Sequence, residues 1–257
     1  MYTKESPIAV FDSGVGGISV LRELVKQMPN ENYLYYGDSA NAPYGDKTTD
    51  EVRALTLAVA KMLVSRGIKA LVVACNTATA AAINDLRQTY PDTVIIGIEP
   101  ALKVAADRFP GGTVGVMATP VTLREEKFHT QLERFPGMTV ELIPVPALVE
   151  LVEAGKQDSP EVEALLRPVL APFAGKLDAV VLGCTHYPFA AKTISAILGE
   201  RTAVLDGGAG TARETKRRLA ERELLRSGEG EILMENSSAD RRLLQLSIAL
   251  LEGKDEI

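Results

Sequence analysis

The sequence has few cysteines and histidines and no tryptophan. Its 257 residues include two cysteines, Cys75 and Cys184, and two histidines, His129 and His186. Two cysteines cannot form the disulfide framework of a small secreted protein. So few Cys and His residues also argue against a zinc cluster, which usually takes about four such ligands. We therefore expect no metal centre.

An excess of basic residues is absent as well. The 34 Asp and Glu residues outnumber the 28 Lys and Arg residues, and the net charge is −6. This balance argues against a protein that binds nucleic acid through a basic surface. No run approaches the roughly 18 consecutive apolar residues of a membrane span, and the N-terminus lacks the basic region and apolar core of a signal peptide. We expect a cytoplasmic protein that works without nucleic acid or membrane.

Short apolar runs alternate with segments in which apolar residues recur at helical spacing. This alternation, with strands rich in Val and Ile, is typical of an α/β protein whose parallel sheets are covered by helices on both faces. The predicted strands cover residues 7–11, 32–36, 70–74, 94–98, 113–118, 139–143, 179–182, 203–205 and 231–234. The predicted helices cover residues 18–27, 49–66, 79–89, 121–135, 159–174, 189–198, 211–225 and 239–251.

Two segments repeat one pattern in the two halves of the chain. ALVVACNTAT at 70–79 and AVVLGCTHYP at 179–188 each combine an apolar strand, a small residue, a cysteine and polar residues that open a helix. Ligands of open α/β sheets bind at the carboxyl ends of the strands. Each half therefore delivers one thiol, Cys75 or Cys184, to an edge where ligands bind.

The surroundings of both thiols suit a reactive role. The unpaired N–H groups and the positive dipole end of a helix N-terminus stabilise a thiolate. Asn76, Thr77 and Thr185 add hydrogen-bonding groups beside the two sulfur atoms. A buried cysteine is often no more than a small hydrophobic residue, but the presence of two cysteines in matched contexts favours chemistry.

Two thiols suit the inversion of a stereocentre that carries an acidic proton. Such a reaction needs a base on one face of the carbon atom and an acid on the other. A pair formed by Cys75 and Cys184 could take both roles and exchange them with the direction of the reaction. Because a proton α to a carboxylate is very weakly acidic, the site also needs donors placed where negative charge develops.

Two loops and two further side chains are candidates for the same site. The segment DSGVGG at 12–17 can bind an anion through its N–H groups, although a tight turn explains it equally well. It matches neither GxGxxG nor GxxxxGK[ST], which argues against a nucleotide site. The segment NAPYG at 41–45 is typical of a turn. His186, two residues after Cys184, is placed to relay a proton or activate the thiol, and Glu153 could orient it; His129 is assigned no role.

Four motifs stand in one order along the chain: FDSGVGGISVLREL, YYGDSANAPYG, VVACNTAT and VVLGCTHYPF. Together they resemble the glutamate racemases, within the broader aspartate/glutamate racemase superfamily. The resemblance runs from about Ile8 to Arg218. The Cys-Thr-His sequence at Cys184 is similar to the glutamate branch, because the aspartate branch typically has Cys-Thr-Glu there.

The resemblance implies a fold, an activity and a biological role. The fold is two similar α/β domains with doubly wound parallel sheets and the active site between them. Residues 1–98 with 206–257 would form the first, discontinuous domain and carry Cys75, and residues 99–205 would form the second and carry Cys184. The activity is a cofactor-independent interconversion of L- and D-glutamate, an isomerase reaction that supplies D-glutamate for cell-wall peptidoglycan. The sequence leaves the oligomeric state open, with a homodimer as one candidate assembly.

The resemblance also implies the roles of individual residues. Cys75 and Cys184 are the two acid/base residues, one for each face of the substrate. Asp12 assists on the Cys75 side, and His186 with Glu153 assists on the Cys184 side. The implied substrate-binding residues are Asp12, Ser13, Tyr44, Gly45, Asn76, Thr77, Thr119, Thr185 and His186, and Thr122 also matches a position near the substrate.

Two segments depart from the family pattern. Gly207-Gly208 follows Asp206 where Ser-Gly is common, and Glu-Asn-Ser-Ser at 235–238 stands where a stretch like Thr-Ser-Gly-Asp is common. Both segments lie outside the catalytic motifs, so they bear on the hinge and the C-terminal packing rather than on the chemistry.

Three alternative functions stay open on the residues alone. An aspartate racemase or related isomerase would act on a substrate shorter by one methylene, which a binding site discriminates by only about 1–3 kcal/mol. A thiol-based sensor or inhibitory binding protein would form a Cys75–Cys184 disulfide or a stable complex, without turnover. A pyridoxal-phosphate racemase would leave the two matched thiols unexplained, and no motif marks a Schiff-base lysine.

Overall fold

A computed structural model of the chain describes residues 2–98, 101–124 and 126–253. These residues divide into two compact units, the first made of residues 2–98 and 208–253 and the second of residues 101–207. The predicted domain bounds include residues 1, 99–100, 125 and 254–257, which lie outside the described residues, and these bounds stay a prediction.

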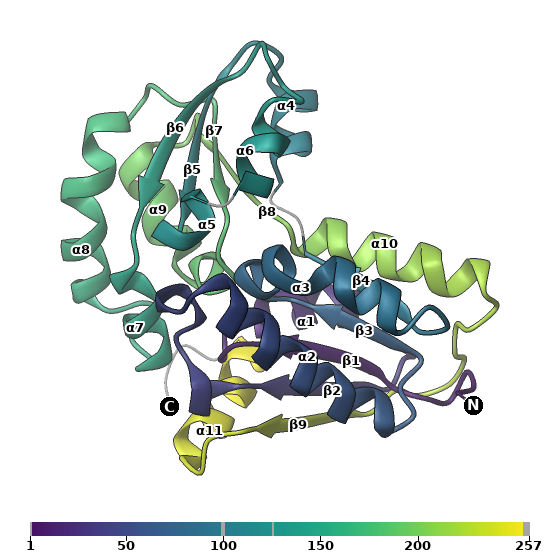
Figure 1. Cartoon of the computed structure of the whole chain (residues 1–257). Coiled ribbons are helices and arrows are strands. Elements are labelled where there is room, and N and C mark those ends of the chain that lie inside the picture. Colours follow the sequence, from purple (N-terminus) through teal and green to yellow (C-terminus); the bar gives the residue numbers. More distant parts are fainter. Residues whose placement is uncertain (1, 99–100, 125, 254–257) are drawn as a thin grey trace. The chain divides into compact units, whose positions relative to one another are not determined.

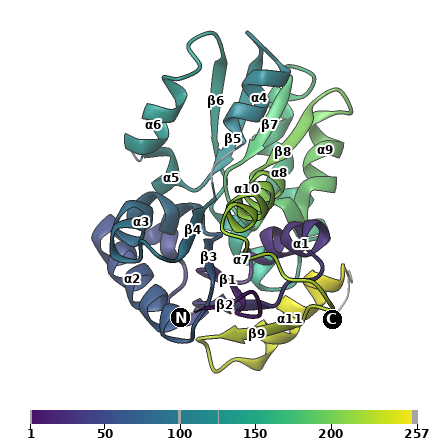
Figure 2. The ribbon, with the colours of Figure 1, turned by 90° about the vertical axis from the view of Figure 1, so that its right-hand side faces the viewer.

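The first unit is built on a parallel sheet of five strands in the order β4-β3-β1-β2-β9. Helices α1, α10 and α11 cover one face of this sheet, and α2 and α3 cover the other (Figure 1, Figure 2). The strands are β1 Ile8–Asp12, β2 Tyr33–Gly37, β3 Ala70–Val73, β4 Val94–Gly97 and β9 Ile232–Asn236. The helices are α1 Ile18–Gln27, α2 Thr49–Ser65, α3 Asn76–Thr89, α10 Gly208–Glu221 and α11 Arg241–Glu252.

The second unit repeats the design with four parallel strands in the order β6-β5-β7-β8. Its apolar cluster joins α4, α5 and α6 to β5 and β7, and α8 packs against α9 on the opposite side (Figure 1). The strands are β5 Thr113–Ala118, β6 Thr139–Pro144, β7 Ala179–Leu182 and β8 Ala203–Asp206. The helices are α4 Leu102–Arg108, α5 Pro120–Arg124, α6 Glu126–Leu132, α7 Ala147–Glu153, α8 Pro160–Leu170 and α9 Ala191–Leu198. The predicted α/β class with two parallel sheets is confirmed.

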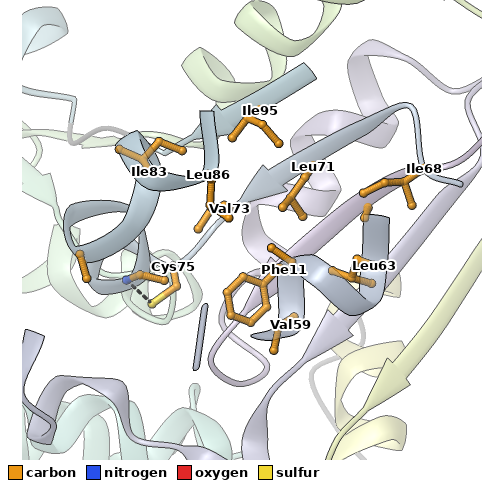
Figure 3. Close-up of a cluster of buried hydrophobic side chains, with 14 of the residues drawn as sticks. Phe11, Val59, Leu63, Ile68, Leu71, Val73, Cys75, Ile83, Leu86 and Ile95 are labelled. Atoms are coloured by element: carbon orange, nitrogen blue, oxygen red, sulfur yellow. Dashed lines mark hydrogen bonds between the residues drawn. The ribbon is translucent and has the colours of Figure 1, made fainter. Parts of the chain in front are cut away.

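The core of the first unit explains why its strands are apolar throughout. Every residue of β1 and β3 is buried, because helices cover both faces of the sheet. Figure 3 shows Phe11 of β1 and Val73 of β3 packed with side chains of the covering helices, among them Leu63 of α2 and Leu86 of α3. Cys75 lies at the border of this cluster, so its sulfur atom is held by a rigid apolar support.

Some helix bounds differ from the predicted ones. The seven-residue helices α4 and α7 were not predicted, because so short a segment shows too little periodicity. Helix α3 begins at Asn76 rather than at 79. The helix predicted from 189 begins at Ala191, after a 3₁₀ turn over Tyr187–Ala190 that contains Pro188. The predicted helix 121–135 contains residue 125, which lies outside the described residues; α5 and α6 stand on either side of it.

A buried ion pair lies at the amino ends of the strands. Lys69 precedes β3 and Glu31 precedes β2, and their side chains are 0% and 2% exposed. Lys69 Nζ pairs with the Glu31 carboxylate and also donates to the carbonyl oxygens of Lys4 and Leu224. Glu31 accepts a hydrogen bond from the backbone N–H of Arg226 at 2.9 Å. The pair therefore joins the start of the chain to the segment that returns from the second unit.

Replacing Lys69 by Met should lower the free energy of unfolding by about 3–5 kcal/mol, because the Glu31 carboxylate is left buried without its cation. Urea unfolding of the purified protein measures this loss. Lys26→Met is the matched control: it removes the pair with Glu23, in which Lys26 is 75% exposed, and should cost less than about 1 kcal/mol. Equal losses in the two variants would contradict the role given to the buried pair.

Candidate functional site

The loop after β1 is fixed around Asp12, the last residue of that strand. The Asp12 side chain is fully buried, and its Oδ1 accepts a hydrogen bond from the Gly14 N–H at 3.0 Å. A Cβ atom at Gly17 would lie 2.5 Å from Asp12 Cβ, so only glycine allows this close approach. Tyr35 donates its hydroxyl proton to the Gly14 carbonyl oxygen at 2.7 Å. The predicted anion-binding loop is thus a rigid element at the carboxyl edge of the sheet.

Cys75 caps the N-terminus of α3, as the sequence predicts. Its Sγ accepts a hydrogen bond from the Ala78 N–H at 3.4 Å (Figure 3) and lies 3.5 Å from Ser13 Oγ. Cys75 is buried but retains 6% exposure. A backbone donor and a hydroxyl group are therefore both within reach of a thiolate at this position.

Asn76 and Thr77 form the first turn of α3 and are buried, each 8% exposed. Asn76 Oδ1 has no hydrogen-bond partner within the part of the chain that the structure describes. A buried carbonyl oxygen without a partner costs about 1–3 kcal/mol. The atom is therefore suited to accept a hydrogen bond from a ligand with N–H groups.

Tyr44 begins a 3₁₀ turn over Tyr44–Asp46 and is buried at 1% exposure. Its hydroxyl donates to Asp38 Oδ2 at 2.7 Å, and its ring meets Phe11 edge to face at 6.3 Å between ring centres. Burial and the hydrogen bond to Asp38 raise the pKa of Tyr44 above its ordinary value, so the hydroxyl stays protonated. Gly45, next to it, is half-buried.

Asp38 was not among the residues predicted for the site. It follows β2 directly and is 2% exposed. Its backbone N–H donates to the Asp12 carbonyl oxygen at 2.9 Å, which places it beside the Asp12 loop. The signal that could have found it is an acidic residue immediately after an apolar strand, inside the motif YYGDSANAPYG.

In the second unit, Cys184 follows β7 and Gly183 and is 9% exposed. A Cβ atom at Gly183 would lie 3.0 Å from Ala118 Cβ and 3.1 Å from the Met117 carbonyl oxygen, so the strand end is tightly packed. The expectation that this thiol also lies at a helix N-terminus is wrong. The chain first turns, with the Tyr187 N–H donating to the Cys184 carbonyl oxygen at 3.2 Å, and α9 begins only at 191.

The side chain of His186, rather than a helix N-terminus, lies beside the Cys184 sulfur atom. Its Nδ1 lies 3.7 Å from Cys184 Sγ, and its Nε2 lies 2.7 Å from Glu153 Oε1 on the last residue of α7. Because a carboxylate oxygen only accepts, Nε2 carries a proton. Burial lowers the pKa of His186, but its hydrogen bonds to Cys184 and Glu153 and the charges of those two groups outweigh burial and raise the pKa well above its usual value. The structure thus brings these three predicted side chains together.

Three threonines were also predicted for the second unit. The hydroxyl groups of Thr119 and Thr122 lie 3.0 Å apart, and Thr119 Oγ1 accepts a hydrogen bond from the Thr122 N–H at the start of α5. Thr185, which stands between Cys184 and His186 in the sequence, is buried. His129 is exposed on α6, and within the described residues no group of three His, Cys, Asp or Glu side chains could hold a metal ion.

The chain is similar to known proteins over almost its whole length. The family model described as Asp/Glu/Hydantoin racemase matches residues 8–215. The glutamate racemase of Clostridium perfringens (strain SM101) is 49% identical over 258 aligned residues, which cover 98% of each chain.

Two solved structures add ligands to the comparison. The Escherichia coli glutamate racemase in complex with L-glutamate and the activator UDP-MurNAc-ala is 31% identical, with a TM-score of 0.85 and coverage of 97% of this chain and 95% of that one. The Francisella tularensis glutamate racemase in complex with D-glutamate is 28% identical, with a TM-score of 0.85 and coverage of 97% and 94%.

Glu153→Gln should lower the pKa of His186. Glutamine can still accept the hydrogen bond from Nε2 but has no negative charge to stabilise the imidazolium. An NMR titration of the histidine ring protons measures the change, with the exposed His129 as internal reference. An unchanged His186 titration would show that Glu153 does not hold the proton on the ring.

Proposed function

We propose that this chain, which belongs to the Asp/Glu/hydantoin racemase family, interconverts L- and D-glutamate by proton transfer at the α-carbon and needs no cofactor. The prediction of a glutamate racemase, an isomerase, is confirmed by the relatives. The single observation that carries the mechanism is the pair of buried free thiols, each at the carboxyl end of a buried parallel strand. Supply of D-glutamate for peptidoglycan is the role that the family implies.

The reaction uses one cysteine as a thiolate base and the other as a thiol acid. One thiolate takes the α-proton, and the carbon atom passes through a state with carbanion character. The other thiol then delivers its own proton to the opposite face, so the product has the inverted configuration. At the end the two sulfur atoms have exchanged protonation states, and the reverse reaction begins from there.

The two thiolates are stabilised by different means. On the Cys75 side, the Ala78 N–H and the Ser13 hydroxyl lie within reach of the sulfur atom. On the Cys184 side, the imidazolium of His186 supplies a positive charge, and Glu153 holds that charge in place. Each group thus favours the anionic form of its neighbouring sulfur atom when that thiol acts as the base.

The remaining predicted residues are assigned to the substrate. We assign the unpartnered Asn76 Oδ1 to the substrate ammonium group. The buried carboxylate of Asp12 assists on the Cys75 side. The other proposed contacts to the carboxylate or ammonium groups come from Ser13, Tyr44, Gly45, Thr77, Thr119, Thr185 and His186.

Two other expectations stay predictions. They are the homodimer and the cytoplasmic location. The described helices include none that combines the length and the apolar character needed to span a membrane.

Racemisation of L-glutamate in D2O, without any added cofactor, tests the proposal. The circular dichroism signal of the amino acid should decay to zero. Early in the reaction, deuterium should appear in the D-glutamate formed and not in the L-glutamate that remains, because the group that delivers a proton is not the one that removed it. A stable signal with glutamate but decay with aspartate would favour the related aspartate activity instead.

Cys75→Ser and Cys184→Ser should each reduce racemisation about 10²–10⁴-fold, since a hydroxyl group is a far poorer acid and base at neutral pH. Each variant retains one thiol, so slow exchange of the α-proton should persist for one enantiomer only, and the two variants should differ in which one. Unchanged thermal unfolding serves as the control for folding. Full racemisation by either variant would refute the two-thiol mechanism.

A further inference from the structure

Asp38 is a buried acidic side chain to which the proposed mechanism gives no task. Its carboxylate accepts hydrogen bonds from neutral donors: the Tyr44 hydroxyl at 2.7 Å and Asn41 Nδ2 at 3.0 and 3.1 Å. At 2% exposure, such a group is costly to bury unless its partners are fixed. Its three hydrogen bonds all lie within the loop at 38–45.

The hydroxyl and the ring of Tyr44 both have partners within the first unit. Its one hydroxyl proton is donated to Asp38, and its ring packs against Phe11 in the core of the first unit. Tyr44 and Cys75 belong to the same apolar cluster, so the residue lies on the side of the unit that carries the thiol. The Tyr44 carbonyl oxygen accepts a hydrogen bond from the Lys47 N–H at 3.2 Å, so Tyr44 is held by its backbone as well as by its side chain.

The returning C-terminal segment holds the same loop from the other side. Asn236, the last residue of β9, donates through Nδ2 to Ser39 Oγ at 2.9 Å. Ser237 Oγ accepts a hydrogen bond from the Ala40 N–H, also at 2.9 Å. These residues belong to the Glu-Asn-Ser-Ser stretch at 235–238 that departs from the family pattern. The side chains that support the loop in this protein therefore differ from those of the family pattern.

We propose that the Tyr44 hydroxyl is an anchor for the loop at 38–45, with Asp38 as its acceptor, and that this anchor positions Tyr44 and Gly45 for glutamate. Asp38 is then a positioning residue, and Asn236 and Ser237 support the loop from β9. The proposal rests on the glutamate racemase function. Loosening an anchored loop weakens the binding of the substrate and of the transition state alike, which raises KM and leaves kcat nearly unchanged.

The test compares Tyr44→Phe, Asp38→Ala, which removes the acceptor oxygen, and the double variant in steady-state racemisation of D-glutamate. Each single variant should raise KM about tenfold or more, as expected for the loss of a hydrogen bond to a carboxylate, and should change kcat less than about threefold. Because both changes remove one interaction, the double variant should raise KM no further than the more affected single variant. Multiplied effects, or a fall in kcat with unchanged KM, would overturn the anchor.

Tyr33→Phe is the matched control. It removes another buried tyrosine hydroxyl, that of the first residue of β2, which donates to the carbonyl oxygens of Leu24 and Met28 near the end of α1. This change should lower the unfolding temperature and leave KM unchanged. A raised KM in this control would show that KM responds to any loss of stability, and would overturn the interpretation.

Ser237 provides a second test, at a residue that the proposed function does not assign to the substrate. Ser237→Ala removes the acceptor of the Ala40 N–H and should raise KM, whereas Ser237→Thr keeps the hydroxyl and should restore it. Equal KM values in the two variants would overturn the support from β9. An unsubstituted protein that does not racemise glutamate overturns the function and the anchor together; an active protein whose Tyr44→Phe variant keeps its KM overturns the anchor alone.

Discussion

Parallel pairing of buried strands is the constraint on which the first unit depends. Strand β1 pairs in parallel with β2 and with β3, so that Asp12 lies opposite Gly37 and Phe11 lies opposite Val73. All three strands therefore end at one edge of the sheet, and the polar residues at these ends are brought together. An edge that holds buried carboxylates must provide each with donors, and the tight loops around Asp12 and Asp38 do so. The arrangement of the loops around these two carboxylates follows from this requirement.

The two thiols show two solutions to one electrostatic problem. Cys75 uses a backbone N–H at a helix N-terminus, a donor whose charge does not change with pH. Cys184 uses His186, whose charge depends on a proton that Glu153 helps to hold. The two motifs look alike in sequence, yet a backbone N–H lies beside the sulfur atom of Cys75 and a titratable side chain lies beside that of Cys184.

The sequence was sufficient to predict the strands, because residues buried on both faces form continuous apolar runs. It was also sufficient to predict that the two cysteines and the loop at Asp12 lie at or just after strand ends. It was not sufficient to predict the hydrogen bond between Asp38 and Tyr44, which forms only when the chain folds back and places the two side chains together. Nor could it establish the contact between Glu153 and His186, which are 33 positions apart and meet at 2.7 Å. The different settings of the two thiols were missed because local turn geometry, set here around Pro188, is invisible to periodicity.

The buried Lys69–Glu31 pair has a consequence for how the chain folds during its synthesis. Two of its hydrogen-bonding partners, the Leu224 carbonyl and the Arg226 N–H, belong to the segment that follows the whole second unit in the chain. On the ribosome, the first 98 residues emerge well before this segment exists. The second unit is contiguous and can fold as soon as it has left the exit tunnel. Until β9 has been synthesised, the charges of Lys69 and Glu31 and the unpaired side of β2 stay exposed to solvent. The unit whose synthesis begins first is therefore the last to finish folding.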